Sequence, residues 1–133
     1  MKAVFADSFY FFALANEKDP ARARAQTFAQ TYQDRVITTD WVLTEVGDGL
    51  AHPDNRAAFL KIVDTLRAEA NVRIVPCEDA LFNAGLTLYR NRLDKAWSLT
   101  DCISFVVMER EGIHEALTGD HHFEQAGFVA LLK

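Results

Sequence analysis

The sequence lacks a long basic run, a closely spaced cysteine pair and a glycine- or serine-rich linker. Its 14 basic residues are outnumbered by 19 acidic ones, so a bound nucleic acid would have to be held by a few local bases or by metal ions. Cys77 and Cys102 lie in apolar stretches and form no C-x-x-C motif, which argues against a zinc motif or a disulfide framework. These features favour a reducing, cytoplasmic location.

Long hydrophobic runs are absent as well. The apolar start of the chain is interrupted by Asp7 and ends at Asn16, before any small-residue cleavage site, so it fits neither a signal peptide nor a membrane span. We instead expect a first strand followed by a core helix. With 133 residues, half of them hydrophobic, and no internal repeat, the chain is expected to form one domain over residues 1–133.

Strand and helix signals alternate along the chain. Short apolar runs predict strands at residues 2–6, 35–39, 72–76, 115–118 and 128–132. Helical periodicity predicts helices at residues 8–16, 19–33, 40–51, 52–70, 78–92 and 98–111, with a short helix from Asp120. Pro20 is expected in the first turn of its helix and Asp40 as an N-cap. This alternation predicts an α/β fold, a three-layer sandwich with a mainly parallel sheet of about five strands.

Four acidic residues stand at strand ends or in apolar helices. Asp7 follows the first strand, Asp120 follows the fourth, Asp101 lies in the first turn of an otherwise apolar helix, and Glu45 lies within residues 40–51. Each also fits a purely structural role. Asp7 and Asp120 suit helix N-caps, Asp101 has capping-box spacing from Ser98, and Glu45 suits the boundary of an apolar stripe.

The four acids carry more information together than singly. The carboxyl ends of parallel strands meet at one edge of the sheet, where a ligand site is expected. Clustered carboxylates repel one another, and a divalent cation offsets that repulsion. Oxygen ligands without thiolates favour Mg²⁺ or Mn²⁺, and such an ion can polarise a phosphodiester and help deprotonate an attacking water.

The segments VFADSFYFFAL, DWVLTEVGDGL, WSLTDCISFVVMERE and ALTGDHHFEQAGF resemble the PIN domain, as found in toxin ribonucleases of the VapBC toxin–antitoxin class. The resemblance covers essentially the whole chain. It implies an endoribonuclease dependent on Mg²⁺ or Mn²⁺, whose catalytic, metal-binding acids are Asp7, Glu45, Asp101 and Asp120. It also implies that the hydroxyls of Ser8 and Thr100 orient these ligands or contact the phosphate. One position departs from the family pattern, because many relatives carry a further acid where this chain has His122.

Basic and histidine residues near the acids have two interpretations each. Arg90, Arg92 and Lys95 precede the acidic helix, where they could contact an RNA backbone or simply form a solvated helix end. His121 and His122 could act as acids or contact phosphate, but adjacent helical residues point in different directions and neither has a paired ligand nearby, which favours a solvated helix cap.

The leading functional hypothesis is a toxin endoribonuclease that cuts single-stranded or looped RNA. One alternative is a metal-dependent phosphatase or phosphotransferase with Asp7 as nucleophile, although no D-x-D motif is present. A second alternative is a non-catalytic binding module in which the acids are only caps. The aromatic run at residues 9–12 has more apolar surface than one core face uses, so a homodimer and a small antitoxin protein covering the helix that starts at Ser8 are the expected partners, with no membrane.

Overall fold

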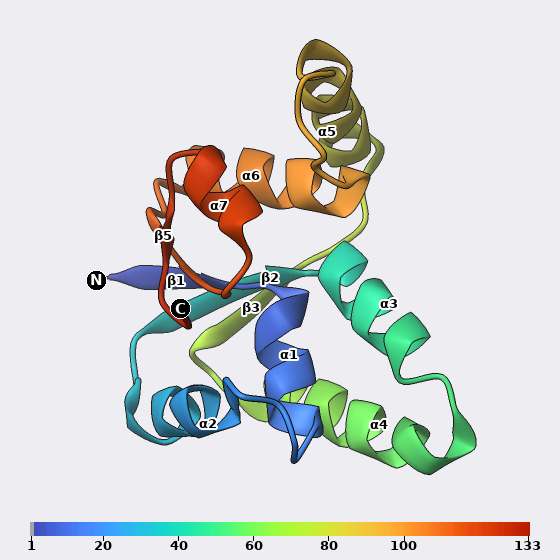
Figure 1. Cartoon of the computed structure of the whole chain (residues 1–133), viewed down its shortest axis with the longest axis vertical. Coiled ribbons are helices and arrows are strands. Elements are labelled where there is room, and N and C mark those ends of the chain that lie inside the picture. The colour runs from blue at the N-terminus through green and yellow to red at the C-terminus, as the bar shows by residue number, and fades with distance from the viewer. Residues whose placement is uncertain (1) are drawn as a thin grey trace.

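The computed structural model describes residues 2–133 and consists of a five-stranded parallel sheet between two layers of helices (Figure 1). The strand order is β3-β2-β1-β4-β5, and every neighbouring pair is parallel. The α/β sandwich predicted from the alternation of strand and helix signals is therefore confirmed. Within the described residues, no helix has both the length and the hydrophobicity needed to cross a membrane.

The strands are short, as is usual for a small parallel sheet. They are β1 (Ala3–Ala6), β2 (Arg35–Thr39), β3 (Val72–Val75), β4 (Glu115–Leu117) and β5 (Val129–Ala130). The helices are α1 (Ser8–Ala15), α2 (Arg22–Thr31), α3 (Asp40–Gly49), α4 (Pro53–Ala68), α5 (Asp79–Asn91), α6 (Leu99–Glu111) and α7 (His121–Gln125).

The order of the strands places a switch point between β1 and β4. The chain moves outward from β1 to β2 and β3 with α1 to α4 on one face, then returns through α5 and α6 on the other face to pair β4 with β1 (Figure 1). Connections that leave neighbouring strands toward opposite faces open a crevice at the carboxyl ends of those strands. Asp7 directly follows β1, and Thr118 directly follows β4, so both lie at this crevice.

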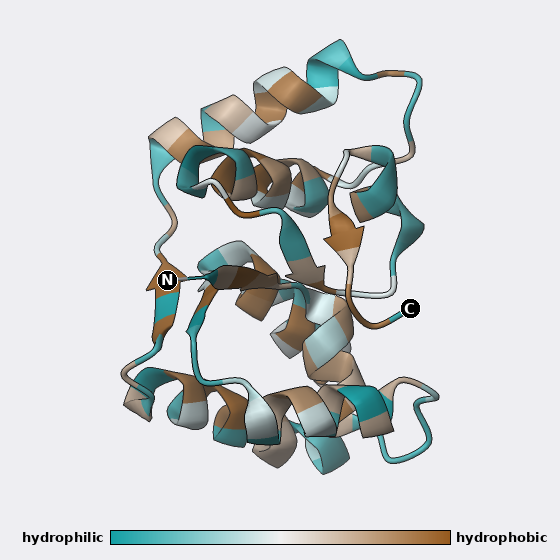
Figure 2. Cartoon of the chain, turned by 90° about the vertical axis from the view of Figure 1, so that its left-hand side faces the viewer, coloured by the Kyte–Doolittle hydropathy of each residue, from teal (hydrophilic) through white to brown (hydrophobic). Residues whose placement is uncertain are grey.

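The core explains why α6 is apolar on most of its surface. Hydrophobic residues line the central strands, whereas the outer loops are mostly hydrophilic (Figure 2). α6 lies between α5 and the rest of the core, and Ile103, Ser104 and Phe105, which point to different sides of the helix, are all buried. Gly85 in α5 permits this packing, because a Cβ atom there would collide with the side chain and backbone of Ile103.

Four local predictions were wrong. Thr39, not Asp40, caps α3, since its hydroxyl accepts a hydrogen bond from the Val42 backbone at 3.1 Å. Pro20 lies in a turn before α2, where the Asp19 side chain caps the turn instead. The last strand contains only Val129–Ala130, although the next two residues stay beside β4, since the Leu131 and Leu132 backbone N–H groups donate to the carbonyls of Ala116 and Thr118. Cys77 was expected in apolar surroundings, but it is exposed to solvent.

Candidate metal centre at the switch point

Asp7 is the most deeply buried acid of the site. Its side chain is only 4% exposed, and its Oδ2 accepts a hydrogen bond of 2.9 Å from the Thr118 hydroxyl, which joins the ends of β1 and β4. Burial raises its pKa from 3.8 to about 7; the Thr118 hydrogen bond opposes this rise, and the nearby charges of Asp101 and Glu45 add to it. Asp7 occupies the N-cap position of α1, but its carboxylate does not cap that helix.

Asp101 begins the buried helix α6 and takes part in a complete capping box. Its backbone N–H donates to the Ser98 hydroxyl at 3.0 Å, and its Oδ2 accepts from the Ser98 backbone at 3.1 Å. Burial raises the pKa of Asp101, and the negative charge of Asp120 raises it further, against the hydrogen bond from Ser98. The Asp101 side chain therefore both caps α6 and belongs to the acidic cluster.

Asp120 caps α7 and lies at the end of β4. Its Oδ1 accepts from the His122 backbone at 2.9 Å, and its own backbone N–H donates to the Thr118 hydroxyl at 3.1 Å. The Thr118 hydroxyl thus contacts both Asp7 and Asp120. The sequence interpretation did not include Thr118; the only available signal was its position two residues before Asp120, which is typical of a serine–threonine turn.

The sequence analysis predicted that the two histidines of α7 point in different directions, but their rings lie side by side. Their ring centroids are 4.3 Å apart, and His121 Nδ1 lies 3.6 Å from Asp120 Oδ1. His122 Nδ1 lies 3.3 Å from Asp120 Oδ1 and 3.4 Å from Asp101 Oδ2. The prediction failed because these residues form the first turn of a five-residue helix, where both side chains reach back toward the N-cap.

Glu45 completes the cluster from α3. It is half-buried, and its charge raises the pKa of Asp7. Three electrostatic pairs thereby link the four acids: Glu45 with Asp7, Asp7 with Asp101, and Asp101 with Asp120. The structure thus brings together acids from four separate parts of the chain.

The donor set fits a divalent cation. It consists of carboxylate oxygens and one buried imidazole nitrogen, without a thiolate, and it carries an excess of negative charge in a largely buried position. Mg²⁺ and Mn²⁺ prefer such oxygen-rich ligands. Asp7, Asp101 and Asp120 could hold such an ion, with Glu45 beside them, and among the described residues Asp120, His121 and His122 bring possible ligand atoms within 4.8 Å of one another.

The hydroxyl residues predicted at the site lie next to its acids in sequence and are half-buried. Ser8 is the first residue of α1 and follows Asp7, and Thr100 immediately precedes Asp101 in the first turn of α6. The side chain of Phe9 lies close to Gly119, where a Cβ atom would approach its ring to 2.5 Å. Gly119 therefore lets α1 pack against the loop that carries Asp120.

The predicted basic residues differ in how they are engaged. Arg90 is exposed in the last turn of α5. Arg92 forms two hydrogen bonds of 3.0 and 3.1 Å with Asp94, and its guanidinium carbon lies 5.0 Å from the centroid of the Trp97 ring. Lys95 lies 3.9 Å from the same Asp94. Arg90 is thus the more accessible of the two arginines for a polyanion.

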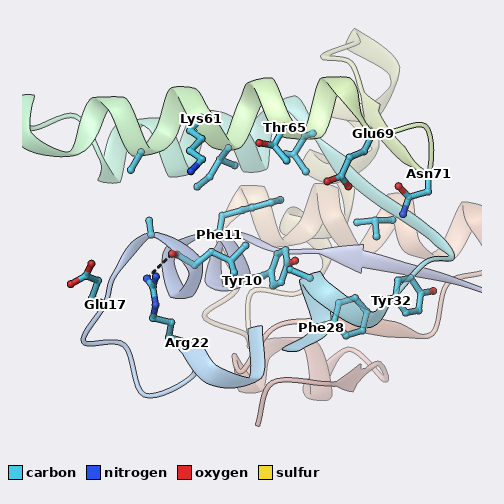
Figure 3. Close-up of a pocket in the computed structure, with 17 residues that line it drawn as sticks. Tyr10, Phe11, Glu17, Arg22, Phe28, Tyr32, Lys61, Thr65, Glu69 and Asn71 are labelled. Atoms are coloured by element: carbon cyan, nitrogen blue, oxygen red, sulfur yellow. Dashed lines mark hydrogen bonds between the residues drawn. The ribbon is translucent and has the colours of Figure 1, made fainter. Parts of the chain in front are cut away.

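A second concave feature lies away from the acids, between α1, α2 and α4 (Figure 3). This cavity has a volume of about 390 Å³ and is lined by aromatic side chains from α1 and α2, namely Tyr10, Phe11, Phe28 and Tyr32. Charged side chains such as Lys61, Glu69 and Arg22 stand at its border. The surplus apolar surface of α1 therefore faces a cavity, while Phe9 and Phe12 pack against the core.

The fold and the site define an α/β domain with a carboxylate cluster at the switch point of a β3-β2-β1-β4-β5 parallel sheet. The chain belongs to the PIN domain family, whose match covers residues 4–129. A solved structure of VapC20 from Mycobacterium tuberculosis, described as a toxin that cleaves the sarcin–ricin loop, is similar over 95% of this chain and 96% of its own, with a TM-score of 0.85 and 25% identity.

A second solved structure, FitAcB from Neisseria gonorrhoeae, shares the fold. It is similar over 96% of this chain and 94% of its own, with a TM-score of 0.65 and 14% identity. No curated protein sequence matches significantly. The resemblance to the PIN domain noted in the sequence is therefore confirmed, and the fold similarity extends across nearly the whole chain.

Proposed function

We propose that this protein is a divalent-metal-dependent endoribonuclease and the toxin of a toxin–antitoxin pair in the cytoplasm. The observation that carries the proposal is the cluster of Asp7, Glu45, Asp101 and Asp120 at the switch point, in a chain of the PIN domain family. RNA loops are the proposed substrate class, since unpaired segments can enter a site that excludes a duplex. The description of VapC20 as a toxin that cleaves the sarcin–ricin loop supports this choice.

The residues of the chain have distinct roles in this proposal. Asp7, Asp101 and Asp120 hold the ion, Mg²⁺ or Mn²⁺, which supplies polarisation of the phosphodiester and a lowered pKa for the attacking water. Thr118 fixes the orientation of the Asp7 carboxylate through its hydroxyl. In the proposal, Glu45 borders the same site and accepts a proton. Ser8 and Thr100 supply hydroxyls at the helix starts, and Arg90 and Arg92 contact the RNA backbone.

The test compares cleavage of a looped RNA by the wild-type protein, Asp7→Asn and Asp101→Asn in Mg²⁺ or Mn²⁺. Each asparagine keeps the shape of the side chain and removes the charge that holds the metal, so both variants should lose cleavage and cellular toxicity while remaining folded. Asp64→Asn, an exposed change on α4, is the matched control and should cleave normally. Cleavage by Asp7→Asn at the wild-type rate would show that Asp7 is no ligand.

The cavity between α1, α2 and α4 is the proposed docking site of the antitoxin. Its aromatic lining suits the apolar face of a partner segment, and its border carries charges of both signs that can pair with the partner. We further propose that the protein is a homodimer. Thr65 faces this cavity, so Thr65→Arg should fill it and abolish neutralisation by the antitoxin without reducing RNA cleavage. Retained neutralisation would place the partner elsewhere.

A further inference from the structure

The Nδ1 atom of His122 is buried, and it has no hydrogen-bond partner anywhere in the part of the chain that the structure describes. Two carboxylate oxygens lie near it, at 3.3 Å on Asp120 and 3.4 Å on Asp101, without the geometry of a hydrogen bond. A buried polar atom without a partner is unusual in a folded protein and calls for an explanation such as an ion. In the tautomer protonated at Nε2, this nitrogen carries a lone pair that a cation in the acidic cluster could accept.

The two distances from His122 Nδ1 to these carboxylate oxygens are close to the spacing of adjacent ligands on one ion. Adjacent ligands of an octahedral ion with bonds of about 2.1 Å are about 3.0 Å apart. The two observed distances exceed this value by only a few tenths of an ångström. A small inward movement of His122 would therefore bring its Nδ1 to ligand spacing from an oxygen of Asp120 and from one of Asp101.

We propose that His122 is a nitrogen ligand of this metal site and makes the site prefer Mn²⁺ over Mg²⁺. The inference rests on the proposed metal-dependent nuclease. Mg²⁺ binds oxygen ligands and retains its waters, whereas imidazole nitrogen suits first-row transition metals. An aspartate at this position would instead leave only oxygen ligands and add a negative charge. His122 thus determines which metal the site selects.

His121 provides a matched control on the same helix. Its side chain is 64% exposed, compared with 20% for His122, and its Nδ1 approaches only Asp120 among the acids of the cluster. A general effect of histidine on α7 would be lost equally in variants of either residue. A ligand role for His122 predicts different results for the two positions.

The experiment measures Mn²⁺ and Mg²⁺ binding by titration calorimetry for the wild-type protein, His122→Asp, His122→Ala and His121→Ala. The wild type and His121→Ala should prefer Mn²⁺. His122→Asp should still bind both ions, with the ratio of the Mn²⁺ affinity to the Mg²⁺ affinity reduced by about tenfold or more. His122→Ala should weaken Mn²⁺ binding more than Mg²⁺ binding, and circular dichroism establishes that each variant is folded.

Pulsed electron paramagnetic resonance of the Mn²⁺-loaded proteins gives a direct second measurement. The ¹⁴N modulation from a bound imidazole should be present in the wild type and His121→Ala and absent in both His122 variants. Mn²⁺ binding without this modulation, or an unchanged affinity ratio in His122→Asp, would overturn the role of His122 while leaving the nuclease proposal intact. Failure of the wild type to bind either ion would overturn both.

Discussion

Replacement of Asp7 by asparagine should stabilise the metal-free protein at neutral and alkaline pH. The Asp7 carboxyl is buried at the end of β1, and its pKa is raised from 3.8 to about 7, with burial as the largest cause. Well below pH 4 the carboxyl is protonated in both the folded and the unfolded chain. Between pH 4 and pH 7 only the unfolded chain loses this proton, so the free energy of unfolding falls as the pH rises.

The size of this effect follows from the two pKa values. A rise of the Asp7 pKa from 3.8 to about 7 lowers the free energy of unfolding by about 4 kcal/mol. This loss is complete above pH 7. The asparagine amide resembles the neutral carboxyl, and its oxygen can still accept the hydrogen bond from Thr118. Asp7→Asn should therefore match the wild type near pH 4 and exceed it by about 2 to 4 kcal/mol at pH 8. For a chain of this length, that is an increase in Tm of roughly 6–12 °C.

The assay is urea and thermal unfolding in EDTA at intervals from pH 4 to pH 8, followed by circular dichroism. Asp64→Asn serves as the control for loss of one negative charge, since Asp64 is exposed on α4, and its stability should follow the wild-type curve. A difference between Asp7→Asn and the wild type that is the same at pH 4 and pH 8 would refute the reasoning. So would a variant that is less stable at both.

Three further predictions address the metal, the core and the RNA path. In thermal unfolding, Mn²⁺ at a hundredfold excess over its Kd should stabilise the wild type by about 3 kcal/mol and should stabilise Asp101→Asn far less. Equal stabilisation of the two proteins would show that Asp101 is not a metal ligand. Gly85→Ala should lower the free energy of unfolding by about 1–3 kcal/mol, because the new methyl group would meet the Ile103 side chain and crowd its backbone. An unchanged urea unfolding curve would show that α5 and α6 separate easily. Arg90→Ala should raise the KM for RNA without changing kcat and should reduce the salt dependence of binding, whereas an unchanged KM would place the RNA elsewhere.

The fold could be predicted from the sequence because its signals are local and periodic. Short apolar runs and amphipathic helices repeat along the chain, and the rules for parallel sheets leave few arrangements for them. The positions of Asp7 and Asp120 at strand ends could likewise be read from the sequence, since those positions depend only on where β1 and β4 end.

The details of the site could not be predicted, because they depend on contacts between distant segments. The hydrogen bond between Thr118 and Asp7 requires the pairing of β4 with β1, which no local pattern reveals. The direction of the His122 ring depends on the short length of α7 and on its packing near Asp101. The cap of α3 was placed one residue late because Thr39 and Asp40 are both good caps, and only the backbone geometry distinguishes them.

The hydrogen bond between Thr118 and Asp7 joins residues separated by 111 positions. β4 lies beside β1 at the middle of the sheet, yet it is made after most of the chain. During translation, a growing chain that ends before residue 115 therefore has Asp7 but neither β4 nor Asp120. Under the proposed function, a growing chain cannot assemble the site that would cut RNA until Thr118 and Asp120 have been made and β4 has paired with β1.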